Sequence, residues 1–153
     1  MKLSEIININ SIKAGLKVDS KEQLLDEMLN LAANTGKIFN KEKAMQDILT
    51  REKVVSTGVG KGIALPHAKT AWSKETVVSF ATLANPVDFN SVDGEPVRIV
   101  FMVICNEGDV ANHLRLLLQI SKLTNIDDFR EKVVCCVLEK EIIKLISEFE
   151  DGE

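Results

Sequence analysis

The chain has 153 residues, of which 27% are charged and 45% hydrophobic, and its formal net charge is −4. This is the size and composition of one ordinary globular domain, so we expect a single domain over residues 1–153. Lysines and arginines are spread among acidic residues, which argues against a nucleic-acid-binding surface, and no apolar run approaches the roughly 20 residues that span a bilayer.

The three cysteines, Cys105, Cys135 and Cys136, are an odd number, and two of them are adjacent. They are poorly suited to a disulfide framework and fit a reducing compartment. Because the start, MKLSEIIN, also lacks a secretory apolar segment, we expect a cytoplasmic protein. No paired spacing of cysteine or histidine suggests a metal site, so we expect the thiols to be small buried side chains.

The pattern of the first third predicts two helices. Residues 1–18 are mixed and fit either a short strand or a loop packed on the core. Ser20 followed by Gln23 has the form of a capping box, and apolar residues at helical spacing come after it. A second helix is expected from Asn40 to residue 52 or 53.

The middle of the chain predicts strands. Alternating glycines within residues 58–62 indicate an extended segment with a bulge or a close backbone approach. A second strand is expected from Val77, with an interruption at Asn85 and Pro86. A third covers residues 97–105, and its continuous apolar run is typical of a strand that is buried on both faces.

Helical spacing returns in the last third. Asp109 is the expected N-cap of a helix with apolar positions between residues 110 and 123, and Asp127 or Asp128 is expected to cap a further one. A last helix carries apolar residues over 142–149. Two helices, a group of strands and three helices predict an α/β domain with helices on both faces of a mostly buried sheet.

His67 is one of only two histidines, and Pro66 precedes it directly. The proline stiffens the backbone and favours extended geometry before it, so His67 is expected at the end of a strand. Such an imidazole is either an ordinary hydrogen-bonded side chain or a nucleophile or general base presented to a partner. Reversible phosphoryl transfer would suit the second interpretation, because it requires a good leaving group with positive charge around it.

His113 follows the expected cap at Asp109 and shares a helical face with apolar residues, so it should point inward. A helix N-terminus favours anions and neutral imidazole. His113 is therefore either a histidine at the edge of the core or a neighbour of His67, since a strand end and a helix start can meet in an α/β fold.

Arg51 lies at the expected C-terminus of the second helix, where a cation complements the helix dipole. Its guanidinium could equally support a phosphoryl group through forked hydrogen bonds. Ser56 and Thr57 either cap or turn the chain or donate hydroxyls to phosphate.

One motif is misleading. Residues 58–62, GVGKG, look like part of a nucleotide-binding loop, but Lys61 is followed by Gly62 rather than by Ser or Thr. The glycine spacing is also wrong, and the segment that follows is extended, so we do not expect nucleotide binding.

Taken together, Glu52, the pair Val59 and Gly60, and residues 63–68 (IALPHA) resemble a known active-site signature. It is that of the enzyme IIA domains of the phosphoenolpyruvate-dependent sugar phosphotransferase system, fructose/mannitol class, which includes the nitrogen-regulatory IIA proteins. Residues 87–103 and the pair His113 and Leu114 are also similar to family features, so the resemblance covers most of the chain.

The resemblance implies that His67 is the phosphorylated residue, that His113 lies beside it, and that Arg51 supports the phosphoryl group. It also implies a mixed β-sheet sandwiched between helices, with no cofactor and no metal ion. Mannitol-type members carry an acidic residue where this chain has Lys61, so any role of that acid is absent here.

By the same resemblance, His67 would accept a phosphoryl group from the carrier protein HPr and pass it to a IIB component. A membrane IIC component then takes up the sugar, which makes contact with the membrane only indirect, and no nucleic acid is involved. Donor and acceptor would dock on an apolar rim, to which Val59, Ile63 and Leu65 contribute unless they belong to the core.

Two functions fit the signature, and residues 68–70 (AKT) favour the first, a fructose-type transport phosphocarrier. The second is a nitrogen-regulatory IIA protein, a switch whose phosphorylation state controls its binding to other proteins. A plain α/β binding module without chemistry is the third and weakest interpretation.

Overall fold

The centre of the fold is a mixed sheet. In the computed structural model, residues 2–151 are described, and six strands among them are β1 (Ile12–Leu16), β2 (Gly58–Gly60), β3 (Ile63–Ala64), β4 (His67–Thr70), β5 (Val77–Val87) and β6 (Val97–Asn106). The strand order is β1-β5-β6-β3-β2, and β4 pairs with β6 beyond the end of β3. Pairing is parallel for β1 with β5 and for β3 and β4 with β6, and it is antiparallel for β5 with β6 and for β2 with β3.

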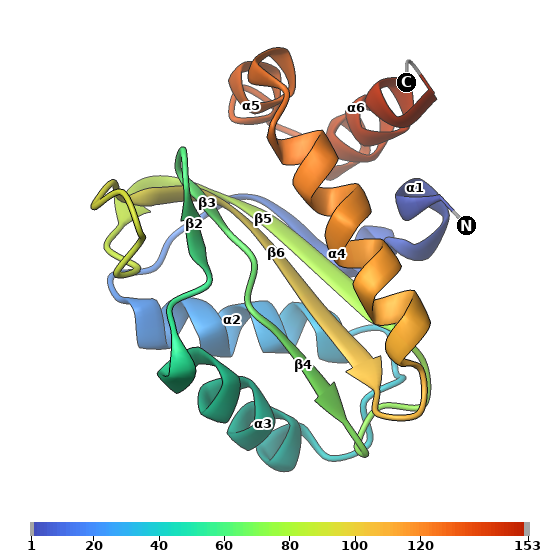
Figure 1. Cartoon of the computed structure of the whole chain (residues 1–153). Coiled ribbons are helices and arrows are strands. Elements are labelled where there is room, and N and C mark those ends of the chain that lie inside the picture. The colour runs from blue at the N-terminus through green and yellow to red at the C-terminus, as the bar shows by residue number, and fades with distance from the viewer. Residues whose placement is uncertain (1, 152–153) are drawn as a thin grey trace.

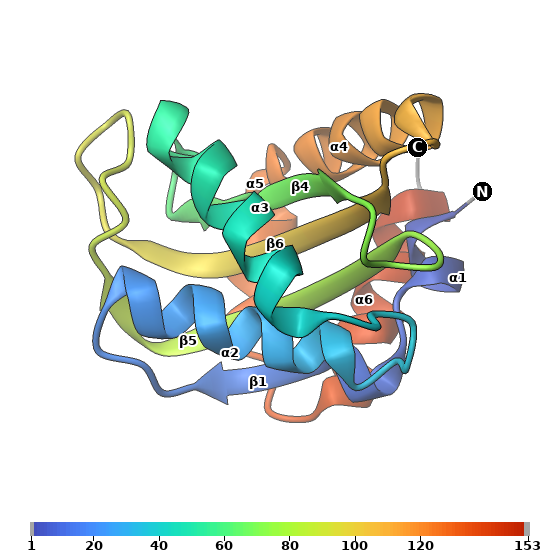
Figure 2. The ribbon, with the colours of Figure 1, turned by 90° about the horizontal axis from the view of Figure 1, so that it is seen from below.

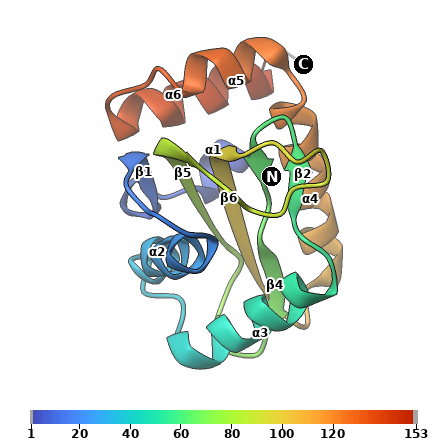
Figure 3. The same cartoon turned by 90° about the vertical axis from the view of Figure 1, so that its left-hand side faces the viewer.

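Helices cover both faces of this sheet (Figure 1). The helices are α1 (Leu3–Ile6), α2 (Lys21–Ala33), α3 (Lys41–Val54), α4 (Val110–Thr124), α5 (Asp127–Val133) and α6 (Glu139–Asp151), with a short 3₁₀ turn at Ile9–Ser11. Figure 2 shows α2 and α3 running across one face, and Figure 3 shows α4, α5 and α6 on the opposite side of the strands. The predicted α/β sandwich is confirmed.

Two apolar layers hold the sandwich together, and β6 contributes to both. Its residues alternate, so that Ile99, Phe101 and Val103 pack in the layer with α4, α5 and α6, whereas the residues between them pack in the layer with α2 and α3. A strand whose successive side chains point to opposite faces can be apolar throughout only if both faces are covered. The predicted burial of the third strand on both faces is therefore confirmed.

The caps of the first two long helices follow the sequence. The Gln23 N–H donates to Oγ of Ser20 at 3.1 Å, and the Lys43 N–H donates to Oδ1 of Asn40 at 3.1 Å. The Gln23 side chain reaches back to the Asp19 N–H rather than to that of Ser20, so the capping box is one residue longer than expected.

The caps of the later helices differ from expectation. Asp109 precedes α4, but its carboxylate accepts from the Asn112 side chain instead of from a backbone N–H of the first turn. The N-cap of α5 is Ile126, so Asp127 and Asp128 lie inside its first turn. Acidic side chains there still favour the positive end of the helix dipole, which explains their position without a cap.

Three other predictions about local structure were wrong or right only in part. The short strand that was one alternative for residues 1–18 is present as β1, but helix α1 before it was not expected. Strand β5 continues through Asn85 and Pro86, although its pairing with β6 shifts register between Thr82 and Val87. The neighbouring strand β1 has ended there, at a pairing of Leu16 with Leu83, so the missing N–H of the proline takes nothing from the pairing with β1. His67 starts β4 rather than ending a strand, because the extended segment is divided at Pro66.

The cysteines match the expectation only in part. Cys105 is buried in β6, but Cys136 is half-buried and Cys135 is exposed near the end of α5. The two adjacent thiols lie in the connection between α5 and α6, where Cys136 packs against the edge of the core and Cys135 faces outward. Within residues 2–151, no helix has both the length and the apolar character that a membrane crossing needs.

Candidate active site

An open hollow of about 470 Å³ lies where α3, β4 and α4 meet, and both histidines line it. His67 is the first residue of β4, and His113 lies in the first turns of α4. Their ring centroids are 5.4 Å apart with the planes tilted by 50°. The strand end and the helix start therefore do meet, and they place two imidazoles in one site.

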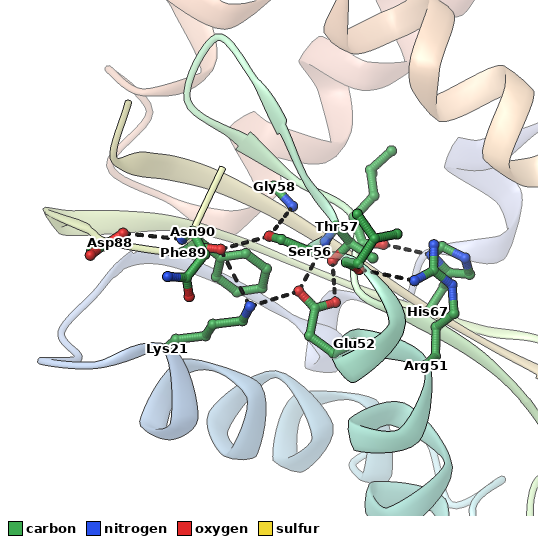
Figure 4. A network of polar contacts seen from close by, with 12 residues as sticks. Lys21, Arg51, Glu52, Ser56, Thr57, Gly58, His67, Asp88, Phe89 and Asn90 are labelled. Atoms are coloured by element: carbon green, nitrogen blue, oxygen red, sulfur yellow. Dashed lines mark hydrogen bonds and ion pairs between the residues drawn. The ribbon is translucent and has the colours of Figure 1, made fainter. Parts of the chain in front are cut away.

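The backbone determines which nitrogen of His67 carries a proton. Nδ1 lies 2.7 Å from the carbonyl oxygen of Leu65 (Figure 4). A carbonyl only accepts hydrogen bonds, so Nδ1 must carry the hydrogen, and the lone pair of the neutral ring is on Nε2. Among residues 2–151, nothing hydrogen-bonds Nε2, which leaves this nitrogen available as a nucleophile.

The surroundings of His67 favour its neutral form. Burial lowers the pKa of the ring, the nearby charges of Arg51 and Lys69 lower it further, and the Leu65 carbonyl and the Glu52 carboxylate oppose the effect. Because the neutral ring is the nucleophilic form, a lowered pKa keeps His67 reactive at and below neutral pH.

His113 is more deeply buried, with 4% of its surface exposed. Desolvation, with smaller contributions from His67 and Lys69, lowers its pKa to about 4, so the ring is neutral at pH 7. Within the described part of the chain, its Nδ1 has no hydrogen-bond partner. A buried polar atom without a partner is costly. The neutral ring can still donate the hydrogen of its other nitrogen to an anionic group.

Arg51 lies in the last turn of α3 and lines the same hollow. Its Nη1 donates to the carbonyl oxygen of Val55 at 3.1 Å, just beyond the helix end. The guanidinium thus hydrogen-bonds the C-terminal end of α3, which is the structural role that the sequence allowed. It also brings positive charge close to His67, which is what support of a phosphoryl group requires. Its remaining N–H groups make the two roles compatible.

The hydroxyls of Ser56 and Thr57 are already engaged in the structure. Ser56 donates to the carbonyl oxygen of Phe89 at 2.7 Å, and Thr57 donates to Oε2 of Glu52, also at 2.7 Å (Figure 4). Neither residue lines the hollow beside His67. Both residues therefore shape the turn that follows α3, which is the first of the two alternatives, and donation to phosphate stays a prediction.

Comparison with known proteins places this geometry in a family. A family model described as the phosphoenolpyruvate-dependent sugar phosphotransferase system, EIIA 2, matches residues 5–149. The chain belongs to this family. The histidine signature and the α/β sandwich are thus features of an EIIA type 2 domain.

Relatives of this EIIA domain carry two kinds of name. A fructose-specific EIIABC component of Bacillus subtilis is 34% identical over 148 residues, which are 97% of this chain and 23% of that protein. A nitrogen regulatory protein of Bradyrhizobium diazoefficiens is 37% identical over 134 residues, which are 87% of this chain and 86% of the relative. The chain therefore spans less than a quarter of the first relative and most of the second.

Solved structures share the EIIA fold. The nitrogen regulatory protein IIA-Ntr of Neisseria meningitidis has a TM-score of 0.87 at 26% identity, and the comparison covers 94% of this chain and 98% of that one. The mannitol IIA protein of Escherichia coli has a TM-score of 0.79 at 20% identity, covering 92% and 98%. The second likeness shows the fold alone.

The rim of the EIIA hollow contains residues that sequence reasoning did not assign to the site. Lys69 lines it from β4, and Leu114 lines it from α4 with 57% of its surface exposed. A strand places residues i and i+2 on one face, so the spacing of Lys69 from His67 could have indicated this position. The exposure of Leu114 could not be predicted, because its helical face contains other apolar residues.

Three residues considered for an apolar rim divide between surface and core. Val59 is 50% exposed, whereas Ile63 and Leu65 are buried. Lys61 turns away from the hollow: its Nζ donates to Oδ1 of Asn125 at 2.7 Å, and its N–H donates to Asp93. Lys61 therefore adds no charge beside His67.

Proposed function

We propose that this EIIA domain is a phosphocarrier in which His67 accepts a phosphoryl group from HPr and passes it to a IIB component. One observation carries the proposal: Nδ1 of His67 is held by the Leu65 carbonyl, and Nε2 is left free beside His113 and Arg51. Such an arrangement presents a neutral nucleophile within a ring of groups that stabilise negative charge.

The transfer follows from this tautomer. The Nε2 lone pair of His67 attacks phosphorus, the N–P bond of the donor phosphohistidine breaks, and its electron pair returns to the donor ring. Phosphorylated His67 then carries positive charge that its Nδ1–H shares with the Leu65 carbonyl. In the second step an acceptor attacks the same phosphorus, and His67 leaves as neutral imidazole, so neither a metal ion nor a nucleotide is required.

His113 and Arg51 would stabilise the moving phosphoryl group. The neutral His113 ring can donate one N–H to a phosphoryl oxygen, and the guanidinium of Arg51 can donate from its free side. Because the donor is already activated, most of the catalysis would come from proximity within a docked complex.

The experiment is phosphorylation in a mixture of phosphoenolpyruvate, enzyme I and HPr, read by intact mass. We expect one acid-labile phosphoryl group on the wild type, none on His67→Ala with its fold intact, and slower transfer by His113→Ala. Phosphorylation that survived in His67→Ala would overturn the assignment, and an unchanged rate in His113→Ala would make that residue structural only.

A nitrogen-regulatory switch is the second candidate function, and the 37% identity to a nitrogen regulatory protein favours it. Offering phosphorylated protein to purified fructose-type IIB separates the two. Rapid transfer to IIB would support a cytoplasmic phosphocarrier that serves sugar uptake through a membrane IIC component. Stable phosphorylation in its presence supports the switch.

A further inference from the structure

A buried carboxylate lies directly behind the His67 site. Glu52 is 8% exposed at the end of α3 and has partners for both of its oxygens. Oε1 accepts the Thr57 N–H at 2.9 Å and lies 3.0 Å from Nζ of Lys21, and Oε2 accepts the Thr57 hydroxyl at 2.7 Å. Figure 4 shows these contacts between α2, α3 and the turn after α3.

The contacts continue from Glu52 to the reactive ring. The Thr57 carbonyl accepts the Leu65 N–H at 2.9 Å, and the Leu65 carbonyl accepts Nδ1–H of His67 at 2.7 Å. We call Glu52, Thr57 and Leu65 the brace. Each of its members is buried, so water cannot replace a hydrogen bond that is lost.

Fold stability alone does not explain the form of the brace. A buried ion pair is weak evidence for stability, because the cost of desolvation can exceed the attraction. Here the carboxylate accepts hydrogen bonds from both the N–H and the hydroxyl of a single residue, Thr57. The carbonyl of Thr57 in turn accepts the Leu65 N–H, which leads toward His67. Two hydrogen bonds to one residue fix its orientation more strictly than one bond would.

We propose that Glu52 is a positioning residue for His67, because through the brace it holds the Leu65 carbonyl that determines which ring nitrogen carries the proton. If the carbonyl is released, the neutral ring can also adopt the Nε2–H tautomer, which has no lone pair at the attacking nitrogen. The consequence for phosphoryl transfer rests on the function proposed above. The consequence for the tautomer does not.

The test uses ¹⁵N-histidine-labelled protein, in which NMR distinguishes protonated from unprotonated ring nitrogens. The chain has only two histidines, so the spectrum contains two rings, and the signals of His113 report whether each variant is folded. Spectra are recorded at pH 8, where both rings are neutral, and the transfer rate from phosphorylated HPr is measured on the same samples.

The variants separate geometry from charge. Glu52→Ala removes both hydrogen bonds to Thr57. Glu52→Gln is the conservative variant, because its amide oxygen can still accept the Thr57 N–H and its amide N–H can donate to the Thr57 hydroxyl. Thr57→Val removes one hydrogen bond and serves if Glu52→Ala does not fold. The matched control is Thr70→Val, because the hydroxyl of this buried threonine in β4 also donates to a carboxylate, at 2.7 Å from Asp47, but lies outside the brace.

We expect wild type, Glu52→Gln and Thr70→Val to keep the Nδ1–H form of His67. Folded Glu52→Ala and Thr57→Val should show a mixture of tautomers and transfer at least about tenfold more slowly, because misplaced reacting groups lose proximity. A pure Nδ1–H form with a wild-type rate in Thr57→Val, or in folded Glu52→Ala, would overturn the proposal.

The outcomes distinguish this inference from the proposed function. If the wild type is not phosphorylated but Thr57→Val still shifts the tautomer, the phosphocarrier function fails and the brace remains. If the wild type is phosphorylated and the tautomer does not respond to either variant, the function remains and the brace fails.

Discussion

At the scale of single residues, the two imidazoles of the site differ in what they can do. His67 has one nitrogen held by a carbonyl and the other free, whereas His113 is buried with Nδ1 lacking a partner among residues 2–151. Both rings are pushed toward the neutral form by desolvation. A nucleophile and a neutral hydrogen-bond donor can therefore coexist without mutual repulsion.

The first prediction concerns the pH at which His67 takes up a proton. Burial and the charges of Arg51 and Lys69 lower its pKa, so the free protein should protonate this ring with a midpoint below about 6.5, the ordinary value. NMR titration of the ring carbons measures it. Arg51→Gln should move the midpoint upward, because one cation near the ring is lost. A midpoint above 6.5 in the wild type would contradict the assigned environment.

The second prediction separates the two roles of Arg51. Arg51→Lys keeps a positive charge at the end of α3, so the free energy of unfolding should change by less than about 1 kcal/mol. It loses the forked donor, so the rate of transfer from HPr should fall at least about tenfold. Lys53→Ala, an exposed lysine in the same last turn of α3, is the control and should leave that rate unchanged.

Stopped-flow quenching with intact mass gives the transfer rate, and chemical denaturation gives the stability. If Arg51→Lys were destabilised while its transfer rate stayed the same, Arg51 would be a helix cap and nothing more.

At the scale of elements, periodicity predicted the structures that carry a strong period. The sequence predicted helices α2, α3 and α4, because their apolar residues recur about every 3.6 residues. It also predicted the buried strand β6, because nearly every residue of that strand is apolar. The sequence did not predict the division of residues 63–70 at Pro66, since both halves pair with β6 in the same register and only the pairing at residues 65 and 66 is missing.

The site was predictable where residue types were rare. Two histidines in 153 residues direct attention to His67 and His113, but Ser56 and Thr57 could serve a turn as easily as a phosphate, and the sequence cannot choose between these roles. Glu52 belongs to the recognised signature, but the positioning role proposed for it depends on contacts with α2 and with the turn after α3 that the sequence does not reveal.

The third prediction belongs to α4 and its exposed apolar residues. Leu114 projects from the rim beside His113 and is 57% exposed, so Leu114→Asp should fold normally. If HPr docks on this rim, a buried carboxylate there should raise the Kd at least about tenfold, which corresponds to about 1.4 kcal/mol. Titration calorimetry measures it.

Val137→Asp is the matched control, because Val137 is 78% exposed in the connection between α5 and α6, away from the hollow. Equal effects of the two changes would indicate a general loss of affinity caused by added negative charge, and would remove α4 from the docking surface.

At the scale of the whole molecule, the two apolar layers on β6 make the sheet and both helical layers depend on one another. The ends of the described chain are joined as well, since the N–H groups of Leu3 and Ser4 donate to the carboxylate of Glu150 at 2.6 and 2.9 Å. Figure 1 shows α1 beside α6 accordingly. A titrating group inside this sandwich therefore influences the unfolding of the whole domain.

The fourth prediction concerns acid stability and depends on His113. The pKa of this ring is about 4 in the folded protein and near 6.5 in an unfolded chain. Above pH 6.5 both states are neutral, and the group has no effect on stability. As the pH falls from 6.5 toward 4, only the unfolded chain takes up the proton, so stability is lost by up to roughly 3 kcal/mol.

His113→Gln cannot take up that proton, so its free energy of unfolding should fall less between pH 7 and pH 4.5 than that of the wild type. Urea denaturation at the two pH values measures both differences. Carboxylates and His67 titrate in both proteins, so their contributions largely cancel when the variant's loss is subtracted from that of the wild type. Equal losses would mean that burial does not lower the pKa of His113 in the folded state, and the ring would then be partly charged at pH 7.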